Sequence, residues 1–354
     1  MSILNAAFAF QCDGKPVSYE EFGSGHINST FIIKTNTGMR YVLQHINKYV
    51  FKDPAQVMEN IGAVTSYLLQ QNGGTYTALH YMQTKEGLYF HLDSRGEYWR
   101  MYEFISGICL NAPECDEDLY QSALAFGQFQ YLLRDFPAET LHETIPNFHN
   151  TIDRYVQFKA SVTADSVGRR TTAAAEIAQL LSWEEKAGTL ERLRNAGELP
   201  LRVTHNDTKL NNVLLNEFTH KNLCVLDLDT VMPGLSLYDF GDAIRFGAST
   251  AAEDEPKLSK VSLNLHLFQV YTKGYLEAVP SLTDKEIEML PLSAFIMTVE
   301  VAVRFLKDYL DGDLYFKIKR PDHNLIRARN QIALAADMER KLPQMTKIIE
   351  ELRK

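Results

Sequence analysis

The feature of this sequence that most constrains its fold is a change of residue pattern near residue 105. Before that point, short runs of β-branched and aromatic residues bounded by Gly, Asn and Asp predict strands, and a helix over residues 54–71 begins at the Asp53-Pro54 cap. After it, long segments with helical periodicity dominate. The runs that predict strands are residues 30–33, 41–43, 88–91 and 98–102. We therefore predict a bilobal α+β fold, with a small strand-rich N-terminal lobe over residues 1–105 and a larger, mainly helical C-terminal lobe over residues 106–354.

The C-terminal segments carry specific helix signals. Residues 116–135 place apolar side chains on one stripe, and Thr283 with Glu286 forms a capping box before another helix. Residues 292–303 are apolar on nearly every side, which is typical of a buried helix, and the run is too short to span a bilayer. We expect this segment to be a buried helix of the helical lobe.

Composition excludes several classes of function. A net charge of −9 with scattered Lys and Arg argues against nucleic-acid binding, and the four cysteines show no zinc-binding spacing. The N-terminal apolar run has no basic residue ahead of it, so we expect neither a targeting segment nor a membrane anchor. Free thiols fit a reducing compartment. We therefore expect a cytoplasmic protein, with a monomer slightly favoured.

The motif that carries chemistry lies in residues 201–250, where short apolar strands alternate with Asn, Asp and Gly. It reads His205-x-Asp207-x-x-x-x-Asn212, and a further apolar strand then ends at Asp227. Phosphoryl transfer requires a carboxylate at the attacking hydroxyl, oxygen ligands for Mg²⁺ and accurate positioning. Asp207 can face the hydroxyl while Asn212 faces the metal, and Asp227 can complete the metal site. The spacing favours phosphoryl transfer, and the absence of GxxxxGK[ST] argues against a P-loop.

This arrangement resembles the catalytic loop of the aminoglycoside phosphotransferase and choline kinase superfamily, which carries HxDxxxxN where protein kinases carry HRDxxxxN. The resemblance implies a protein-kinase-like bilobal fold and the use of ATP with Mg²⁺. It also implies that Asp207 is the catalytic residue, that Asn212 and Asp227 are metal ligands, and that His205 is a structural member of the loop. Asp229 is then a carboxylate that faces the substrate or supports the metal ligands.

A second acidic motif, Asp239-Phe240-Gly241, spells the metal-binding triplet of protein kinases. It lies far from Asn212 and does not end an apolar strand, so Asp227 fits the metal role better. By the same superfamily resemblance, Asp239 is expected to be a buried anchor that accepts hydrogen bonds from the backbone of the catalytic loop.

The nucleotide is expected to bind to the N-terminal lobe. Gly23 and Gly25 lie between predicted strands and could cover the phosphates through backbone N–H groups. The crossing segment over residues 101–105 resembles the kinase hinge, in which backbone groups of Glu103 and Ile105 would contact adenine. A plain edge strand is the alternative reading of that segment.

One position departs from the kinase pattern. The strand over residues 41–44 ends at Gln44, where a kinase places its phosphate-binding Lys. A neutral amide makes a weaker contact with phosphate than a cation does, and Glu59 on the following helix then loses its role as a partner. Gln44 is retained as a nucleotide contact. Lys34 or Lys48 could compensate for the missing charge, or Mg²⁺ and the backbone alone could suffice.

A closer resemblance identifies an expected substrate. The segments GHINSTF, YVLQHIN, WRMYEFI and RFLKDYLDGDLYF, together with residues 201–250, resemble the N-acetylhexosamine 1-kinase family over essentially the whole chain. The resemblance implies phosphorylation of the anomeric hydroxyl of N-acetylglucosamine or N-acetylgalactosamine. It points to His26, Arg304 and Tyr315 as sugar contacts, with Asp207 at the reacting hydroxyl and Asp229 facing the substrate.

Two alternatives remain open from the sequence. The first is a kinase of another small molecule, such as choline, methylthioribose, homoserine or an aminoglycoside, although a cationic substrate would favour a clearer acidic or aromatic cluster in the helical part. The second is a nucleotide-binding protein without transfer activity, which the missing strand Lys suggests and the intact Asp207, Asn212 and Asp227 oppose.

Overall fold

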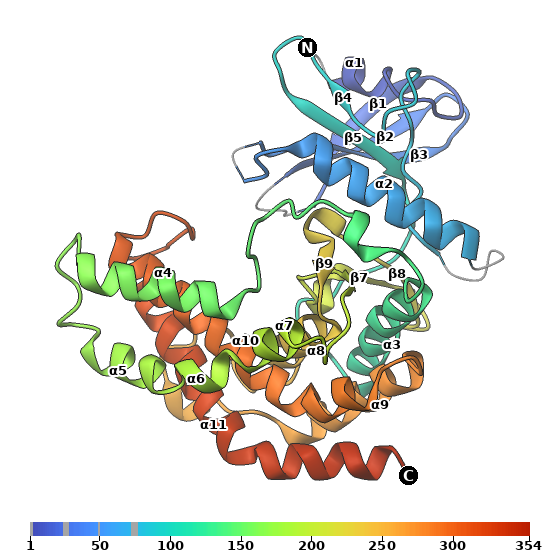
Figure 1. Cartoon of the computed structure of the whole chain (residues 1–354). Helices are drawn as coiled ribbons and strands as arrows, with labels where there is room; N and C mark the ends of the chain where they lie inside the picture. Colours follow the sequence, from blue (N-terminus) through green and yellow to red (C-terminus); the bar gives the residue numbers. More distant parts are fainter. Residues whose placement is uncertain (1–2, 24–27, 49, 72–76) are drawn as a thin grey trace.

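The computed structural model describes residues 3–23, 28–48, 50–71 and 77–354. The N-terminal part is built on an antiparallel sheet with strand order β1-β2-β3-β5-β4, drawn at the top of Figure 1. A short helix, α1 (Ile3–Ala7), lies beside the sheet, and the long helix α2 (Pro54–Gln71) connects β3 to the later strands. The strands are β1 (Pro16–Glu21), β2 (Ser29–Thr35), β3 (Arg40–Ile46), β4 (His91–Leu92) and β5 (Tyr98–Glu103).

Hydrophobic burial explains most of this sheet. The central strands β2 and β3 bury Ile33 and Leu43 completely, and β5 buries Met101, in one apolar cluster with Phe10 and Trp99. Such β-branched and aromatic side chains fit a pleated surface that is covered on one face. The pairing of β3 with β5 sets Gln44 directly opposite Arg100.

The strands predicted over residues 30–33, 41–43 and 98–102 and the helix over 54–71 are confirmed. The strand predicted over residues 88–91 is wrong, because only His91 pairs in β4. Tyr89 packs instead against Gly62 of α2 and makes a hydrogen bond of 3.0 Å with Ser66. Strand β1 was not predicted, since all of its residues after Pro16 are exposed and it lacks the alternation of a half-buried strand.

The C-terminal part is mainly helical and surrounds α10 (Asp284–Asp311), as Figure 1 shows. The predicted capping box of Thr283 and Glu286 begins this helix. Among the described residues, α10 is the one helix long and apolar enough to cross a membrane, but 83% of its apolar window is buried inside the protein, as expected for a core helix. The other helices are α3 (Asp116–Leu132), α4 (Thr151–Ala164), α5 (Ala174–Ser182), α6 (Glu184–Ala187), α7 (Thr189–Asn195), α8 (Ser236–Gly247), α9 (Leu265–Ala278) and α11 (His323–Leu352).

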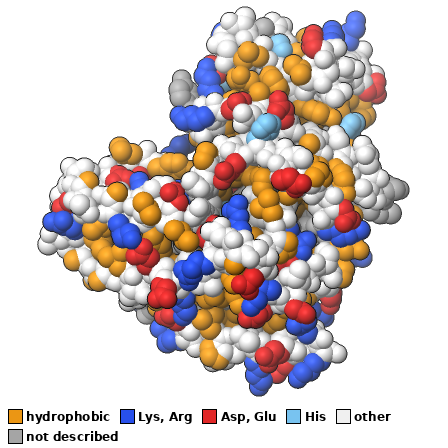
Figure 2. Space-filling model, viewed as in Figure 1, with side chains coloured by type: hydrophobic (Ala, Val, Ile, Leu, Met, Phe, Trp, Pro, Cys, Tyr) orange, Lys and Arg blue, Asp and Glu red, His pale blue; other side chains and the backbone are white. Residues whose placement is uncertain are grey.

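Two short antiparallel ribbons lie between the sheet and the helices. One ribbon pairs β6 (Arg202–Thr204) with β9 (Met232–Gly234), and the other pairs β7 (Val213–Leu215) with β8 (Asn222–Val225). The segments that join these strands carry the predicted catalytic residues, so the ribbons fix those residues at the junction of the two parts (Figure 1). On the face drawn in Figure 2, Lys and Arg side chains are interspersed with Asp, Glu and hydrophobic side chains.

Candidate active site

The catalytic loop begins where β6 ends and is held by Asp239 in the first turn of α8. The Asp239 carboxylate accepts hydrogen bonds from the backbone N–H groups of His205 at 2.9 Å and Asn206 at 2.7 Å, and from Nε2 of Gln130 at 2.7 Å. Burial raises the pKa of Asp239, while His205 and these hydrogen bonds act in the opposite direction. Asp239 is therefore a buried carboxylate that accepts hydrogen bonds from the backbone of the loop.

His205 ties the loop to the end of β8. Its ring is fully buried and packs edge-on against Phe126 and Phe129 of α3. Nδ1 lies 3.3 Å from the backbone N–H of Asp207 and must accept from it, so Nε2 carries the proton and donates to the carbonyl oxygen of Leu226 at 2.8 Å. One imidazole ring thus fixes the backbone at Asp207 relative to the residue that precedes Asp227.

Asp207 and Asn212 face each other across the loop, with the short helical turn η2 (Leu210–Asn212) between them. The side-chain amide of Asn212 donates to the backbone carbonyl of Asp207 at 2.8 Å and to its Oδ2 at 3.1 Å. Lys209 Nζ lies 2.6 Å from Oδ1 of Asp207. Lys209 was missed from the sequence, although a cation two residues after the catalytic Asp on the same loop was the available signal.

Asp227 follows β8 with a left-handed backbone, φ 55°, a conformation that Asp tolerates better than most residues. Its side chain is open to solvent, yet protein surrounds it on most sides. The resulting partial desolvation, with the negative charges of Asp229 and Asp207, raises the pKa of Asp227 to about 6. The three carboxylates are therefore close enough to repel one another.

This set of donors fits a magnesium ion bound together with phosphates. A cation among the carboxylates would relieve their repulsion, and Asn212 and Asp227 supply oxygen atoms of the kind that Mg²⁺ prefers. Within the described ranges, no three His, Cys, Asp or Glu side chains form a metal-binding cluster. That result is consistent with Mg²⁺, which protein sites commonly bind through one or two carboxylates plus substrate phosphates and water.

Asp229 lies in η3 (Leu228–Thr230) and is 4% exposed. One of its oxygens forms an ion pair with Arg100, and the other accepts a hydrogen bond from Nδ2 of Asn28 at 2.7 Å. Protein donors therefore occupy both oxygens of the residue that was expected to face the substrate. Contact of Asp229 with a substrate would require one of these donors to be exchanged.

Gln44 points toward Arg100 on the neighbouring strand. Arg100 Nε donates to Oε1 of Gln44 at 2.8 Å, and Nε2 of Gln44 donates to the hydroxyl of Thr30 at 3.1 Å. The cations proposed as replacements for the strand lysine have other partners, because Lys34 pairs with Glu20 at 3.4 Å and Lys48 with Glu97 at 3.0 Å. Arg100, which was missed from the sequence, is the cation that contacts Gln44.

Glu59 on α2 is directed elsewhere. Its carboxylate lies 2.7 Å from Nε2 of His142, at the surface. The side chain of α2 that meets Arg100 is Met58, whose sulfur lies 4.0 Å from the guanidinium. The acidic partner of the cation is therefore supplied by Asp229 and not by α2.

The structure describes part of the other residues that were expected to contact the nucleotide. Gly23 has φ +76°, and no atom lies within 4 Å of the place where a Cβ would stand; Gly25 and His26 lie outside the described residues. At the end of β5, the N–H of Glu103 donates to the carbonyl of His80 at 3.1 Å, and the Glu103 carboxylate pairs with the His80 ring at 3.0 Å. Ile105 follows in the segment that crosses to the helical part.

Arg304 and Tyr315 lie together near the aromatic residues Phe148 and Phe316. The Arg304 guanidinium lies 5.1 Å from the ring centroid of Phe148 and 5.7 Å from that of Phe316, and Tyr315 packs edge-on against Phe316. Tyr315 is 66% exposed and is not a core residue. Glu300, four residues before Arg304 on α10, pairs with His149 at 2.8 Å.

This cluster adjoins the catalytic loop through His149. The ring of His149 stacks beside Phe148, and its Nε2 lies 3.3 Å from the carbonyl of Asn206, the residue before Asp207. Among the described residues, neither Arg304 nor Tyr315 makes a hydrogen bond or ion pair with Asp207. The structure brings both residues to one side of the loop but shows no hydrogen bond or ion pair between them and the Asp207 carboxylate.

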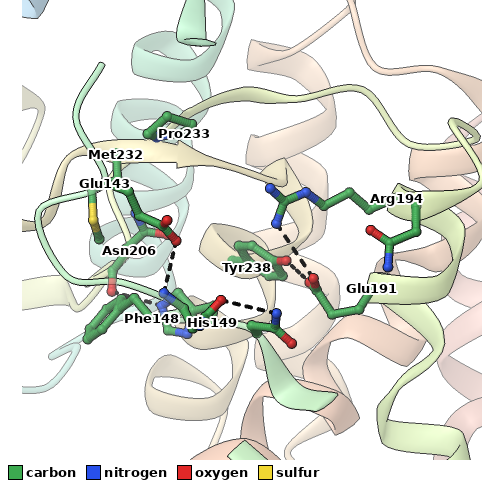
Figure 3. Close-up of a pocket in the computed structure, with 12 residues that line it drawn as sticks. Glu143, Phe148, His149, Glu191, Arg194, Asn206, Met232, Pro233 and Tyr238 are labelled. Atoms are coloured by element: carbon green, nitrogen blue, oxygen red, sulfur yellow. Dashed lines mark hydrogen bonds and ion pairs between the residues drawn. The ribbon is translucent and has the colours of Figure 1, made fainter. Parts of the chain in front are cut away.

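A cavity of about 190 Å³ lies behind the loop at Asn206. In Figure 3, Phe148, His149 and Asn206 line one side of this cavity, and Glu191, Arg194 and Tyr238 lie on the other. Burial raises the pKa of Glu191, which accepts a hydrogen bond from the Tyr238 hydroxyl and lies 3.5 Å from Arg194. Glu191 and Arg194 of this cavity thus bind one another, and Asp207 is not among the lining residues.

Comparison with known proteins connects this geometry to a family. The model of the phosphotransferase enzyme family (APH) matches residues 18–263, which include most of β1, the other strands of the sheet and the whole catalytic loop. The match is longer than half of the 354-residue chain. The predicted superfamily resemblance is therefore confirmed at the level of this family.

Solved structures agree on the fold. An aminoglycoside phosphotransferase from Alicyclobacillus acidocaldarius has 12% identity and a TM-score of 0.67, with 99% of this chain and 97% of that chain covered. A microcompartment-associated aminopropanol kinase has 16% identity and a TM-score of 0.62, with 97% of both chains covered. An amicoumacin kinase in complex with AMP-PNP, Ca²⁺ and its ligand has 12% identity and a TM-score of 0.59, with 99% and 92% covered.

These similarities confirm the predicted kinase-like fold, with a strand-rich N-terminal sheet and a helical C-terminal part. At such low sequence identity, these similarities show the fold but do not identify a substrate. The catalytic loop, the acidic residue after the next strand and the family match agree with one another. The chain belongs to the phosphotransferase enzyme family.

Proposed function

We propose that this protein transfers the γ-phosphoryl group of ATP to the anomeric hydroxyl of N-acetylglucosamine or N-acetylgalactosamine, giving ADP and the sugar 1-phosphate. The observation that carries the proposal is the meeting of Asp207, Asn212 and Asp227 at the junction of the two parts, in a chain of the phosphotransferase family. The substrate itself rests on the sequence resemblance over the whole chain.

Asp207 receives the sugar hydroxyl. An anomeric hydroxyl is more acidic than an ordinary alcohol, so Asp207 serves mainly by orienting the oxygen and accepts its proton late in the reaction. Lys209 forms an ion pair with Oδ1 of Asp207. Its positive charge then lies next to the phosphoryl group during transfer. His205 and Asp239 keep the loop backbone fixed, which limits the reorganisation needed during transfer.

The nucleotide binds between the N-terminal sheet and the ribbons. Asn212 and Asp227 would hold Mg²⁺, which neutralises charge on the phosphates when bound. Nucleotides and a divalent cation occur with related proteins, for example AMP-PNP and Ca²⁺ with the amicoumacin kinase. In this proposal, Gly23 and Gly25 cover the phosphates through their backbone groups. Backbone groups of Glu103 and Ile105 contact adenine. The boundary between the two lobes lies at residue 105.

The charges near Arg304 favour a neutral acceptor over a cationic one. Arg154 donates to the carbonyl of Phe148 at 2.7 Å, and burial together with the charge of Arg304 lowers its pKa. Two guanidinium groups thus lie around Phe148 on the side of the loop where Tyr315 lies. A quaternary ammonium or an aminoglycoside would be repelled there, whereas sugar hydroxyls and an acetamido group accept hydrogen bonds from Arg.

The sugar contacts in this proposal are His26, Arg304 and Tyr315, with Asp229 as a further contact once its own donors are exchanged. The protein acts in the cytoplasm, where ATP is available and where the free cysteines remain reduced. A monomer suffices for the reaction, because the proposed contacts all come from one chain.

The test is a panel of acceptors assayed for ADP release with MgATP. The panel contains both N-acetylated hexosamines, their unacetylated forms, choline, methylthioribose, homoserine, 1-amino-2-propanol and an aminoglycoside. We expect the highest kcat/KM with one of the N-acetylated sugars. Absence of turnover with both sugars, together with turnover of another acceptor, would replace the proposed substrate and leave phosphoryl transfer intact.

The second candidate is an amino alcohol kinase, because a microcompartment-associated aminopropanol kinase shares the fold at a TM-score of 0.62. An ammonium group requires a carboxylate or an aromatic cage close to the reacting hydroxyl. Turnover of 1-amino-2-propanol that exceeds turnover of both sugars is the result that would favour this candidate.

A further inference from the structure

Arg100 occupies an unusual position in the N-terminal sheet. It lies on β5 directly opposite Gln44 of β3, the position at which kinases of this fold place a phosphate-binding lysine. Its side chain is only 2% exposed. A buried guanidinium is costly unless charged and polar partners surround it, so its contacts indicate what the site is built to hold.

The contacts orient the guanidinium toward the metal-binding segment. Oε1 of Gln44 accepts from Nε of Arg100 at 2.8 Å, which fixes the inner side of the group. The outer nitrogen NH1 pairs with the carboxylate of Asp229, which lies two residues after Asp227. Met58 covers the group from α2 with a sulfur atom and offers no competing charge. Arg100 is thereby held next to the residues proposed to bind Mg²⁺.

We propose that Arg100 is the phosphate-binding cation of the nucleotide site, taking the place of the strand lysine, and that it exchanges Asp229 for phosphate oxygens when ATP binds. The inference rests on the proposed use of ATP. A guanidinium that holds a carboxylate presents the geometry that also suits phosphate, because Arg binds both through two parallel N–H donors. Gln44 then acts as the positioning residue that aims Arg100.

The exchange gives Asp229 a defined role. In the nucleotide-free protein it supplies the counter-charge that a buried Arg requires. When the phosphates take over Arg100, the oxygen of Asp229 that held the guanidinium becomes available to another donor. The expectation that Asp229 faces the substrate would be met in that state.

The experiment compares the affinities of AMP-PNP and adenosine by isothermal titration calorimetry, in EDTA and with Mg²⁺, for wild type, Arg100→Gln, Arg100→Lys and Asp229→Asn. One charge-assisted contact contributes about 1.5–3 kcal/mol, so Arg100→Gln is expected to weaken AMP-PNP binding about 10- to 100-fold. Adenosine binding should stay unchanged. Arg100→Lys should fall between wild type and Arg100→Gln, since it keeps the charge and loses the fork.

Asp229→Asn separates this role from a structural one. Phosphate binding predicts that the freed guanidinium binds AMP-PNP in EDTA as tightly as in wild type or more tightly. A structural ion pair between the two parts predicts equal losses for Asp229→Asn and Arg100→Gln, and that result would overturn the proposal. Lys34→Gln removes a charge from the same sheet at an exposed site and serves as the matched control.

Two further results separate failure of the Arg100 proposal from failure of the proposed function. An unchanged ratio of AMP-PNP to adenosine affinity in Arg100→Gln also overturns the role of Arg100, and where that variant fails to fold, Arg100→Lys decides the point. If wild type itself binds no AMP-PNP and phosphorylates no acceptor, the proposed function fails, which is a separate outcome from failure of Arg100.

Discussion

The ammonium group of Lys209 lies 2.6 Å from Oδ1 of Asp207, two residues earlier on the same loop. Asn212 contacts the other carboxylate oxygen at 3.1 Å. The proposed catalytic carboxylate is therefore fixed from both sides before any substrate binds. Preorganised polar groups of this kind stabilise a transition state at little cost in reorganisation.

Replacing Asp207 by Asn should lower kcat by about 10²- to 10⁴-fold, the range expected when general base catalysis is lost. The affinity for AMP-PNP should remain close to the wild-type value, because the nucleotide contacts lie on other residues. Steady-state kinetics and calorimetry measure the two quantities. Asp135→Asn, an exposed residue paired with its neighbour Arg134, is the matched control, and an unchanged kcat in Asp207→Asn would contradict the assigned role.

Replacing Lys209 by Ala should lower kcat by about 10²-fold, the lower end of the effect measured when one charge-stabilising donor is removed from an active site. The KM for the sugar should change less than kcat, since the ammonium group acts on the developing charge. A variant with raised sugar KM and normal kcat would assign Lys209 to ground-state binding instead.

Turnover should require a divalent cation. EDTA should abolish it and Mg²⁺ should restore it, and Asp227→Asn and Asn212→Ala should both need a higher Mg²⁺ concentration for half-maximal rate. The reason is that each variant removes one oxygen ligand of the proposed metal site. Rates measured across a Mg²⁺ series at fixed ATP test this, and curves identical to wild type would show that the metal binds elsewhere.

Replacing Asp239 by Ala should destabilise the protein by about 2–4 kcal/mol, because the buried N–H groups of His205 and Asn206 would lose their acceptor and each unsatisfied donor carries a desolvation penalty. Urea unfolding followed by circular dichroism measures the change. Loss of activity should accompany it, since the catalytic loop depends on the same contacts. Wild-type stability in this variant would mean that Asp239 does not anchor the loop.

Cys224, on the strand that leads to Asp227, should not react with thiol reagents in the folded protein. Burial raises the pKa of its thiol to about 12, and only the thiolate is reactive. At pH 8, Ellman's reagent should label the exposed Cys115 first and Cys224 only after unfolding. Rapid labelling of Cys224 in native protein, located by peptide mass spectrometry, would show that β8 opens readily.

The catalytic loop could be predicted from the sequence because its residues are close together in the chain. His205, Asp207 and Asn212 share one loop, and Asp227 ends the next hairpin, so residue type and spacing alone were sufficient to predict that they meet. The anchoring contacts of Asp239 followed from the family resemblance. Each of these contacts involves a short stretch in which few alternative arrangements exist.

The contact between Gln44 and Arg100 could not be predicted from the sequence in the same way. It depends on the register between β3 and β5, strands separated by α2 and a long connection, and register is a property of the assembled sheet. The sequence did carry one signal, an Arg between Trp99 and Met101 in a run that is otherwise aromatic or apolar over residues 98–102. A charge inside such a strand indicates either an exposed face or a buried partner, and only the structure identifies Asp229.

The two errors in the predicted sheet also arise from properties of the assembled structure. The aromatic residues at 88–91 resemble a strand by composition, but Tyr89 uses its ring to cover Gly62 of α2. Strand β1 has the opposite property, because Glu20 and Glu21 pair in the sheet while their side chains remain exposed. In both segments, packing against neighbouring elements determines whether a strand forms. Local strand propensity does not predict that packing.

The most direct test of phosphoryl transfer to the anomeric carbon is ³¹P NMR of a reaction containing the protein, MgATP and N-acetylglucosamine or N-acetylgalactosamine. We predict a new sugar phosphate resonance coupled to the proton on C1, which appears as ADP forms and grows about 10²- to 10⁴-fold more slowly with Asp207→Asn. A phosphate on another carbon, or no transfer to any acceptor of the panel although the wild-type protein is folded, would contradict the proposed reaction.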